Sequence, residues 1–194
     1  MHVHVAVLHM GWIRWELSAW LLWVAATERR MLVSIKYYGA DPQGRPIASN
    51  RNRIVRDRPP GADKVLMLDS DTVPPKNLLD IALMEHDIVF CPSPIWRAGR
   101  VISNVKPLEG STVDVGRDEV IEVAAGGGGA FCVSCAVLDA LPGAFMDRYD
   151  ADGVTTMTED YIFCDAARSA GYRIYAALGY PIGHVKEINI ATIP

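Results

Sequence analysis

Two carboxylates one residue apart follow a short apolar run, and this spacing has the clearest chemistry in the chain. Asp69 and Asp71 come directly after the apolar residues 65–68, and Pro74-Pro75 prevents the run from continuing as a strand. Such a run is typical of a strand buried in a parallel sheet, where ligands bind at the carboxyl ends of the strands. Because oxygen ligands suit Mg²⁺ and Mn²⁺, the spacing predicts a divalent-cation site. The same Asp-Ser-Asp-Thr sequence is equally good turn and N-cap chemistry.

A second pair of acids opens a predicted helix in the C-terminal third. Thr158 has the N-cap position, and Gly171 stands just past the end of the apolar pattern. Glu159 and Asp160 therefore occupy the first turn. Acids in a first turn also serve simply to complement the helix dipole, so the pair alone does not establish a site.

The order of these motifs, taken together with a late histidine, resembles the GT-A glycosyltransferases, especially their family 2-like group. In that group a DxD strand end, an ED pair opening a helix and a late His recur in this order, and here they are Asp69 to Asp71, Glu159-Asp160 and Gly183-His184. Ser49 to Val55 resembles the Arg-Asn helix that precedes the DxD strand in these enzymes. Gly126 to Val133 resembles the glycine-rich strand entry that borders the donor sugar and the acceptor.

The resemblance implies a GT-A fold, a nucleotide-diphosphate sugar as donor and Mn²⁺ or Mg²⁺ as cofactor, with UDP-sugar favoured and GDP-sugar as the alternative. It implies two sets of ligands. The metal set is Asp69, Asp71 and His184, and the donor set is Asp69, Arg51, Asn52, Met10, Gly127 and Gly128. One departure concerns recognition of the nucleotide base. The acidic signature usual after the second strand is missing, and residues 35–41 stand there instead.

Inverting transfer of a sugar to an acceptor hydroxyl would require a base, whereas retaining transfer would not need one in the same place. We expect an inverting reaction with Asp160 as that base. Glu159 would orient it or bind the sugar. The acceptor class stays open among a glycan, a protein, a lipid head group and a modified base. Two alternatives also stay open. One is a nucleotidyltransferase, although the glycine- and arginine-rich loop usual after its first strand is replaced by residues 8–13. The other is a non-enzymatic relative that binds a nucleotide or a protein.

Composition predicts one globular domain. The chain has 194 residues, half of them apolar, which is enough for a sizeable core, and a net charge of -4 argues against binding nucleic acid by bulk charge. We expect residues 1–95 to form the nucleotide-sugar half and residues 96–194 the acceptor and catalytic half.

Strand and helix patterns alternate along the first half, which predicts right-handed βαβ crossovers and a Rossmann-like, mainly parallel central sheet flanked by helices. Shorter strands around a turn at residues 97–100 predict a small antiparallel element on the acceptor side. The expected strands are 3–9, 31–37, 64–68, 87–91, 101–106 and 119–124, and the expected helices are 12–29, 48–57 and 75–84.

The predicted first helix is rich in tryptophan, with Trp12, Trp15, Trp20 and Trp23 on one side. Leu17 and Leu21 make the other side apolar too, and no basic belt is present, so we expect a buried crossover helix. A membrane-interface face and a homodimer face through Trp12–Trp23 are the alternatives, with protein contact the stronger. The ten apolar residues 17–26 are too few for the roughly 20 that span a bilayer.

Four cysteines are present, and only Cys132 and Cys135 have CxxC spacing. A closed zinc site needs four ligands, and neither a second CxxC nor a suitably spaced His pair is present, so we expect both to be small core residues. The chain opens on a strand-like run rather than a secretory signal. We therefore expect a cytoplasmic protein.

Overall fold

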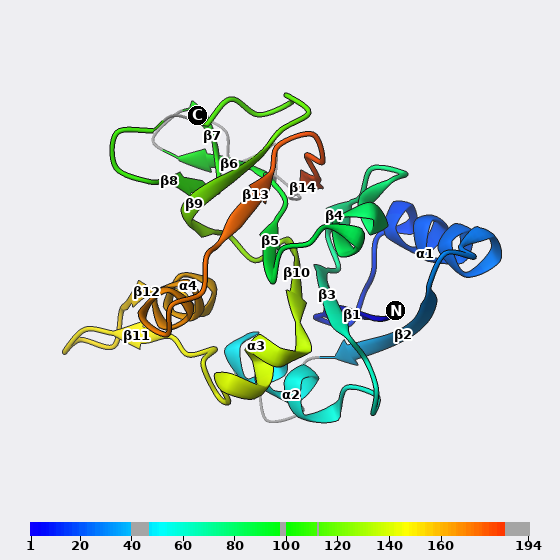
Figure 1. Cartoon of the computed structure of the whole chain (residues 1–194). Coiled ribbons are helices and arrows are strands. Elements are labelled where there is room, and N and C mark those ends of the chain that lie inside the picture. Colours follow the sequence, from blue (N-terminus) through cyan, green and yellow to red (C-terminus); the bar gives the residue numbers. More distant parts are fainter. Residues whose placement is uncertain (40–46, 98–99, 112, 185–194) are drawn as a thin grey trace, which may run out of the picture.

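The computed structural model describes residues 1–39, 47–97, 100–111 and 113–184. Its main feature is an eight-stranded sheet with the order β2-β1-β3-β10-β5-β13-β9-β8 (Figure 1). The strands are β1 (His2–His9), β2 (Leu32–Gly39), β3 (Lys64–Asp69), β5 (Ile88–Phe90), β8 (Val105–Pro107), β9 (Val120–Gly126), β10 (Ala130–Ser134) and β13 (Tyr175–Ala177). The sheet draws on both halves of the chain.

Most strands of this sheet run in one direction. β2, β1, β3, β5, β13 and β8 share one direction, and β10 and β9 run against them. The predicted mainly parallel α/β architecture is therefore confirmed. The position of β10 between β3 and β5 was not predicted, because an antiparallel insertion has no signature in the local pattern of either neighbour.

Three two-stranded ladders complete the described strands. β4 (Thr72–Val73) pairs with β14 (Gly183–His184), β6 (Pro94–Arg97) with β7 (Arg100–Ser103), and β11 (Arg148–Tyr149) with β12 (Thr155–Met157). The β6–β7 ladder is the antiparallel hairpin expected around residues 97–100. The turn residues 98–99 themselves lie outside the described part of the chain.

The helices are α1 (Trp15–Thr27), α2 (Ile47–Asp57), α3 (Cys135–Ala140) and α4 (Glu159–Ser169), with a 3₁₀ helix η1 (Leu78–Leu83). The segment expected as an α-helix at 75–84 is thus a shorter 3₁₀ helix. Its start is fixed by two bonds that span three residues, from Leu78 N to Pro75 O (3.0 Å) and from Asp80 N to Asn77 O (2.9 Å).

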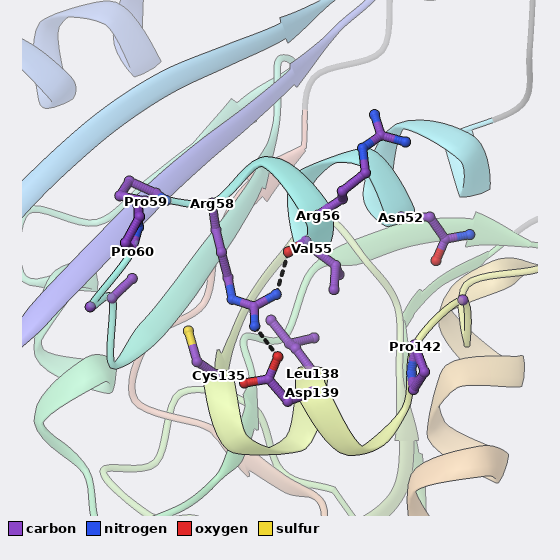
Figure 2. Close-up of a pocket in the computed structure, with 13 residues that line it drawn as sticks. Asn52, Val55, Arg56, Arg58, Pro59, Pro60, Cys135, Leu138, Asp139 and Pro142 are labelled. Atoms are coloured by element: carbon purple, nitrogen blue, oxygen red, sulfur yellow. Dashed lines mark hydrogen bonds and ion pairs between the residues drawn. The ribbon is translucent and has the colours of Figure 1, made fainter.

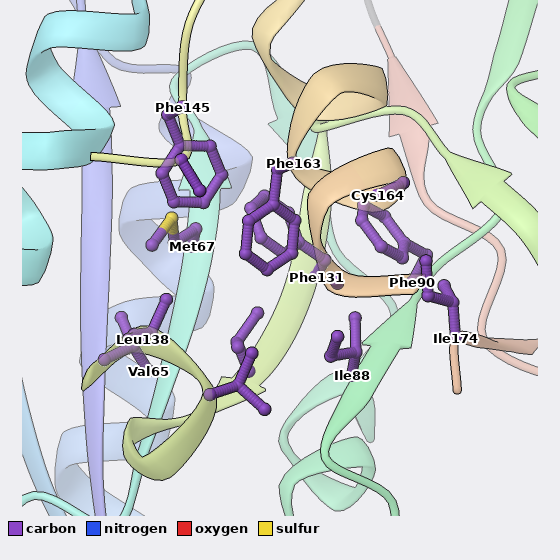
Figure 3. Packing of buried hydrophobic residues seen from close by; sticks show 14 of the residues in the cluster. Val65, Met67, Ile88, Phe90, Phe131, Leu138, Phe145, Phe163, Cys164 and Ile174 are labelled. Atoms are coloured by element: carbon purple, nitrogen blue, oxygen red, sulfur yellow. The ribbon is translucent and has the colours of Figure 1, made fainter. Parts of the chain in front are cut away.

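The core lies on both faces of the sheet, because side chains alternate along β3. Val65 and Met67 join the cluster covered by α2, α3 and α4, whereas Leu66 and Leu68 join the cluster covered by α1 and η1. Aromatic rings fill the first cluster (Figure 3). Phe90 stacks on Phe131 with centroids 4.8 Å apart, and Phe145 stacks on Phe163 at 4.6 Å.

The CxxC cysteines also separate between these two faces. Cys132 packs in the cluster under α1, and Cys135 in the cluster under α2 and α4. Both are buried, as predicted, and burial raises the pKa of Cys132 to about 12. Two thiols on opposite faces of a sheet are poorly placed to share one metal ion.

Helix α1 is buried on one side only. Leu17, Leu21 and Trp20 face the sheet, and the Trp20 indole Nε1 donates to Lys76 O at 3.2 Å. Trp15 and Leu22 are each more than 70% exposed, at 72% and 73%. The expectation of a fully buried helix was therefore wrong for its outer side, which is apolar and open, and the homodimer through this helix stays a prediction. Across the residues described, no helix has the length and apolar character needed to cross a membrane.

Acid should weaken the fold through His4. This residue is 1% exposed, with Nδ1 3.0 Å from Ser34 Oγ and Nε2 3.1 Å from Tyr38 Oη. Burial, reinforced by the charges of His2 and Lys36, lowers the pKa of His4 to about 4. Below the ordinary pKa of about 6.5 the unfolded chain binds the proton first, so the native state loses stability as the pH falls towards 4.

Comparison with His4→Gln isolates this effect from the titration of carboxylates. Between pH 7 and pH 4 the free energy of unfolding of the wild type should drop by up to about 3 kcal/mol more than that of the variant. Urea unfolding at both pH values measures the difference. Parallel pH profiles of the two proteins would contradict the assignment.

Candidate functional site

The DxD carboxylates lie where β3 ends. Asp69 is the last residue of β3, and its N–H donates to Gly129 O at 3.0 Å, so the strand is paired with the glycine run up to its end. Asp71 follows just before β4. β4 pairs with β14 so that His184 stands opposite Thr72. This short ladder brings a histidine 113 residues away to the DxD turn, where its Nε2 lies 2.7 Å from Asp71 Oδ2.

Asp71 and His184 offer one carboxylate oxygen and one imidazole nitrogen to a cation, a donor set that fits Mn²⁺ and is acceptable to Mg²⁺. Among the described residues, no group of three or more His, Cys, Asp or Glu side chains is placed to hold a metal ion. A cation at this pair would complete its shell with water and ligand oxygens, as Mg²⁺ usually does at sites for phosphorylated substrates.

Arg51 links the two acidic motifs from inside the protein. Its side chain is 1% exposed, with Nη2 3.2 Å from Asp69 Oδ1 and Nε 3.0 Å from Glu159 Oε1. Nη2 also donates to Gly128 O at 3.0 Å, and the guanidinium lies 5.0 Å from the centre of the Phe131 ring. The buried guanidinium of Arg51 thus holds the DxD strand end, the ED helix and the glycine run together.

Burial also sets the acidity of these carboxyl groups. Desolvation, opposed by Arg51 and reinforced by Asp71 and Glu159, raises the pKa of Asp69 to about 7. Desolvation likewise raises the pKa of Glu159 against the opposing charge of Arg51. Both groups are therefore harder to ionise than surface acids, and a cation nearby would favour their charged forms.

Asp160 is held at the start of α4 by both of its oxygens. Oδ2 accepts from Gly128 N at 2.8 Å, and Oδ1 accepts from Tyr161 N at 2.8 Å and from the Thr158 hydroxyl. Thr158 is the N-cap residue, as predicted, but its side chain bonds Asp160 and accepts no backbone N–H of the helix. Asp160 is 9% exposed, so its carboxylate is fixed in position next to the glycine run.

The glycine run Gly126–Gly129 is close-packed. A Cβ on Gly126 would lie 2.4 Å from the Phe90 ring, and one on Gly128 would lie 2.3 Å from Arg51 Nη2. None of the four has a positive φ. The run could have been a phosphate nest, a hinge or close packing, and its geometry is that of close packing, which lets Arg51 and Asp160 approach the backbone.

A pocket of about 160 Å³ opens beside the DxD turn. Two residues of the predicted donor set, Met10 and Asp69, line it, and Met10 is 67% exposed. Sequence reasoning missed Trp12, Ile47 and Asn50 at this place. The full lining is Leu8, His9, Met10, Trp12, Ile47, Asn50, Asp69, Ser70 and Asp71.

The other predicted donor contacts lie behind this pocket. Arg51 faces the interior, and the Asn52 amide donates to Phe145 O at 2.7 Å on the opposite side of α2. Gly127 and Gly128 contact Asn104 and Arg51. These residues shape the site through packing and internal hydrogen bonds, with Met10 and Asp69 on its surface.

Comparison with solved structures identifies the fold that carries this site. No protein-family model and no curated protein matches the chain. The solved structure of GalNAc-T7 with UDP, GalNAc and Mn²⁺ has a TM-score of 0.64 at 9% identity, over 97% of this chain and 44% of that one. The chain has the GT-A fold. A197 from STIV is similar as well, with a TM-score of 0.61 at 17% identity, over 96% of this chain and 87% of that one.

A larger cavity, of about 570 Å³, lies at the opposite end of the central strands, where β3 begins and β10 ends (Figure 2). Arg58 spans it by donating to Val55 O and to the Asp139 carboxylate. This cavity does not adjoin the carboxyl ends of the parallel strands, and none of the DxD and ED residues lines it.

Proposed function

We propose that this protein is a metal-dependent glycosyltransferase that moves a sugar from a nucleotide-diphosphate donor to an acceptor hydroxyl. The observation that carries the proposal is the contact between His184 and Asp71 at the carboxyl end of β3. It joins a late histidine to a DxD turn through the short β4–β14 ladder, beside the pocket that Met10 and Asp69 line. The GT-A fold supports this class of reaction without specifying it.

The donor would lie between the Met10 pocket and the DxD turn. Asp71 and His184 would hold Mn²⁺ or Mg²⁺, and Asp69 would contact the donor or the metal-bound water. When bound, the cation neutralises the charge that develops on the diphosphate leaving group. UDP-sugar is the favoured donor, with GDP-sugar as the alternative.

The chemical step would use the fixed carboxylate of Asp160. The acceptor oxygen attacks the anomeric carbon as the bond to the diphosphate oxygen breaks, and Asp160 takes the hydroxyl proton. This attack from the face opposite the leaving group inverts the anomeric centre. Glu159 is bound to Arg51 and would act by orienting the first turn of α4, which carries the base. In this assignment residues 1–95 supply the donor half, and residues 96–194 the acceptor half, of one domain.

Donor binding should depend on both the metal and Asp71. With Mn²⁺ present, calorimetry should give an affinity for UDP that falls at least tenfold, about 1.4 kcal/mol, on Asp71→Ala or on chelation with EDTA. The loss arises because the cation is the main partner of the diphosphate, and Asp71 is its main protein ligand.

Asp152→Ala is the matched control, since this exposed aspartate lies in the turn between β11 and β12. It should bind UDP as the wild type does. GDP in place of UDP tests the choice of base. Equal affinity of the wild type with and without Mn²⁺ would reject the metal-dependent donor site.

A further inference from the structure

An apolar cavity of about 440 Å³ lies next to the candidate metal ligand His184. Its walls are the chain that follows β5, strand β7 and the segment that leads into β14. Ile182 N donates to Pro92 O at 2.9 Å and fixes two of these walls to each other. The lining residues are Pro92, Ser93, Pro94, Ile102, Ser103, Val115, Pro181, Ile182 and Gly183.

The cavity is joined to the candidate base by one buried asparagine. Asn104 Oδ1 accepts from Ser93 N in the cavity wall at 2.7 Å, and Asn104 Nδ2 donates to Gly127 O at 3.1 Å. The next residue, Gly128, donates to Asp160. The Tyr161 hydroxyl, one residue beyond Asp160, donates to Asn104 O at 3.0 Å. The cavity wall and the ED helix are therefore parts of one hydrogen-bonded unit.

The chemistry of the lining selects the ligand. Within the described part of the wall, no side chain is charged and none is aromatic. Ser103 Oγ already accepts from Val105 N at 3.2 Å. Ser93 Oγ is buried and has no hydrogen-bond partner among the described residues. A sugar ring would bury several hydroxyls without partners here, which is costly, whereas an alkyl or aryl group matches the wall.

We propose that this cavity is an acceptor subsite that takes an apolar group, an alkyl chain or an aryl ring, carried next to the hydroxyl that receives the sugar. The inference rests on the proposed glycosyltransferase function and specifies its acceptor. The size of the cavity lies within the roughly 300–1,000 Å³ usual for small-molecule sites.

Primary alcohols from butanol to octanol are suitable probes, titrated into the intact protein and followed by NMR or calorimetry. The affinity should rise about fourfold per added methylene until the cavity is filled. Val115→Arg should lower the affinity for octanol at least tenfold, because it places a charge in the mouth of the cavity from a residue that is 41% exposed. Val154→Arg, at a 60% exposed valine outside the cavity, is the matched control and should leave it unchanged.

Affinity that does not depend on chain length, or that Val115→Arg leaves intact, would overturn the apolar subsite.

Binding of UDP with Mn²⁺, measured on the same samples, separates the two proposals. If UDP binds and the alcohols do not, the acceptor inference fails while the donor site stands. If the alcohols bind and UDP does not bind with any divalent metal, the acceptor assignment fails together with the proposed function. Binding of both, with transfer of sugar from a UDP-sugar to the longer alcohols, supports the inference.

Discussion

Asp160→Asn is expected to reduce turnover by ~10² to 10⁴ while donor affinity stays within roughly twofold of the wild type. The amide preserves the size of the side chain but cannot take the proton of the acceptor hydroxyl. Since an amide has one acceptor oxygen, it can serve Gly128 N or Tyr161 N but not both, so a loss of about 1 kcal/mol in stability should accompany the change. Steady-state kinetics, UDP calorimetry and urea unfolding measure the three quantities.

Asp165→Asn is the control for this experiment, because Asp165 is exposed on the same helix α4. It should retain the wild-type rate. Asp71→Ala should show the opposite emphasis and lose donor binding as well as rate. If Asp160→Asn transfers sugar at nearly the wild-type rate, Glu159 becomes the next candidate for the base, or the reaction retains the anomeric configuration.

Arg51→Met should have the largest effect on stability, a loss of roughly 3–5 kcal/mol in the free energy of unfolding. The change removes a buried cation and leaves the carboxylates of Asp69 and Glu159 without their partner. Adding Glu159→Gln to the same variant should recover part of the loss, because it removes one of the two unpaired charges. Urea unfolding of the single and double variants measures both effects.

Arg56→Met is the matched control, since the Arg56 side chain on the same helix is 73% exposed. This substitution should lower the free energy of unfolding by at most about 0.5 kcal/mol. Should Arg51→Met fail to accumulate as folded protein, Arg51→Lys retains the charge, loses the fork and is expected to give an intermediate loss. If Arg51→Met is as stable as the wild type, the hydrogen-bond network of Arg51 contributes nothing to stability.

The first half of the fold was predictable because its information is local. The runs that became β1, α1, β2, α2 and β3 carry their own periodicity, and their observed bounds differ from the expected ones by a few residues. The insertion of β10 between β3 and β5 depends on pairing across distant parts of the chain. Pattern alone cannot supply that pairing.

The candidate site shows the same difference between local patterns and contacts of distant segments. Order and residue type were enough to propose Asp71, His184 and the ED pair, and the structure places His184 against Asp71. The role of Arg51 was different, because an arginine in a polar helix segment gives no sign that it will be buried. Its contacts with Asp69, Glu159 and Gly128 exist only once three separate elements have packed together.

The glycine run has a consequence for how the protein is made. Arg51 contacts it across 77 residues of sequence, Thr72 across 57 and Asn104 across 23. Contacts of this range form late in folding, because the entropy of closing long loops must be overcome before they can contribute. During synthesis, β1 to β3 emerge before the run, and the site is incomplete until the run has arrived. Ligand binding by this protein would therefore report the completion of folding.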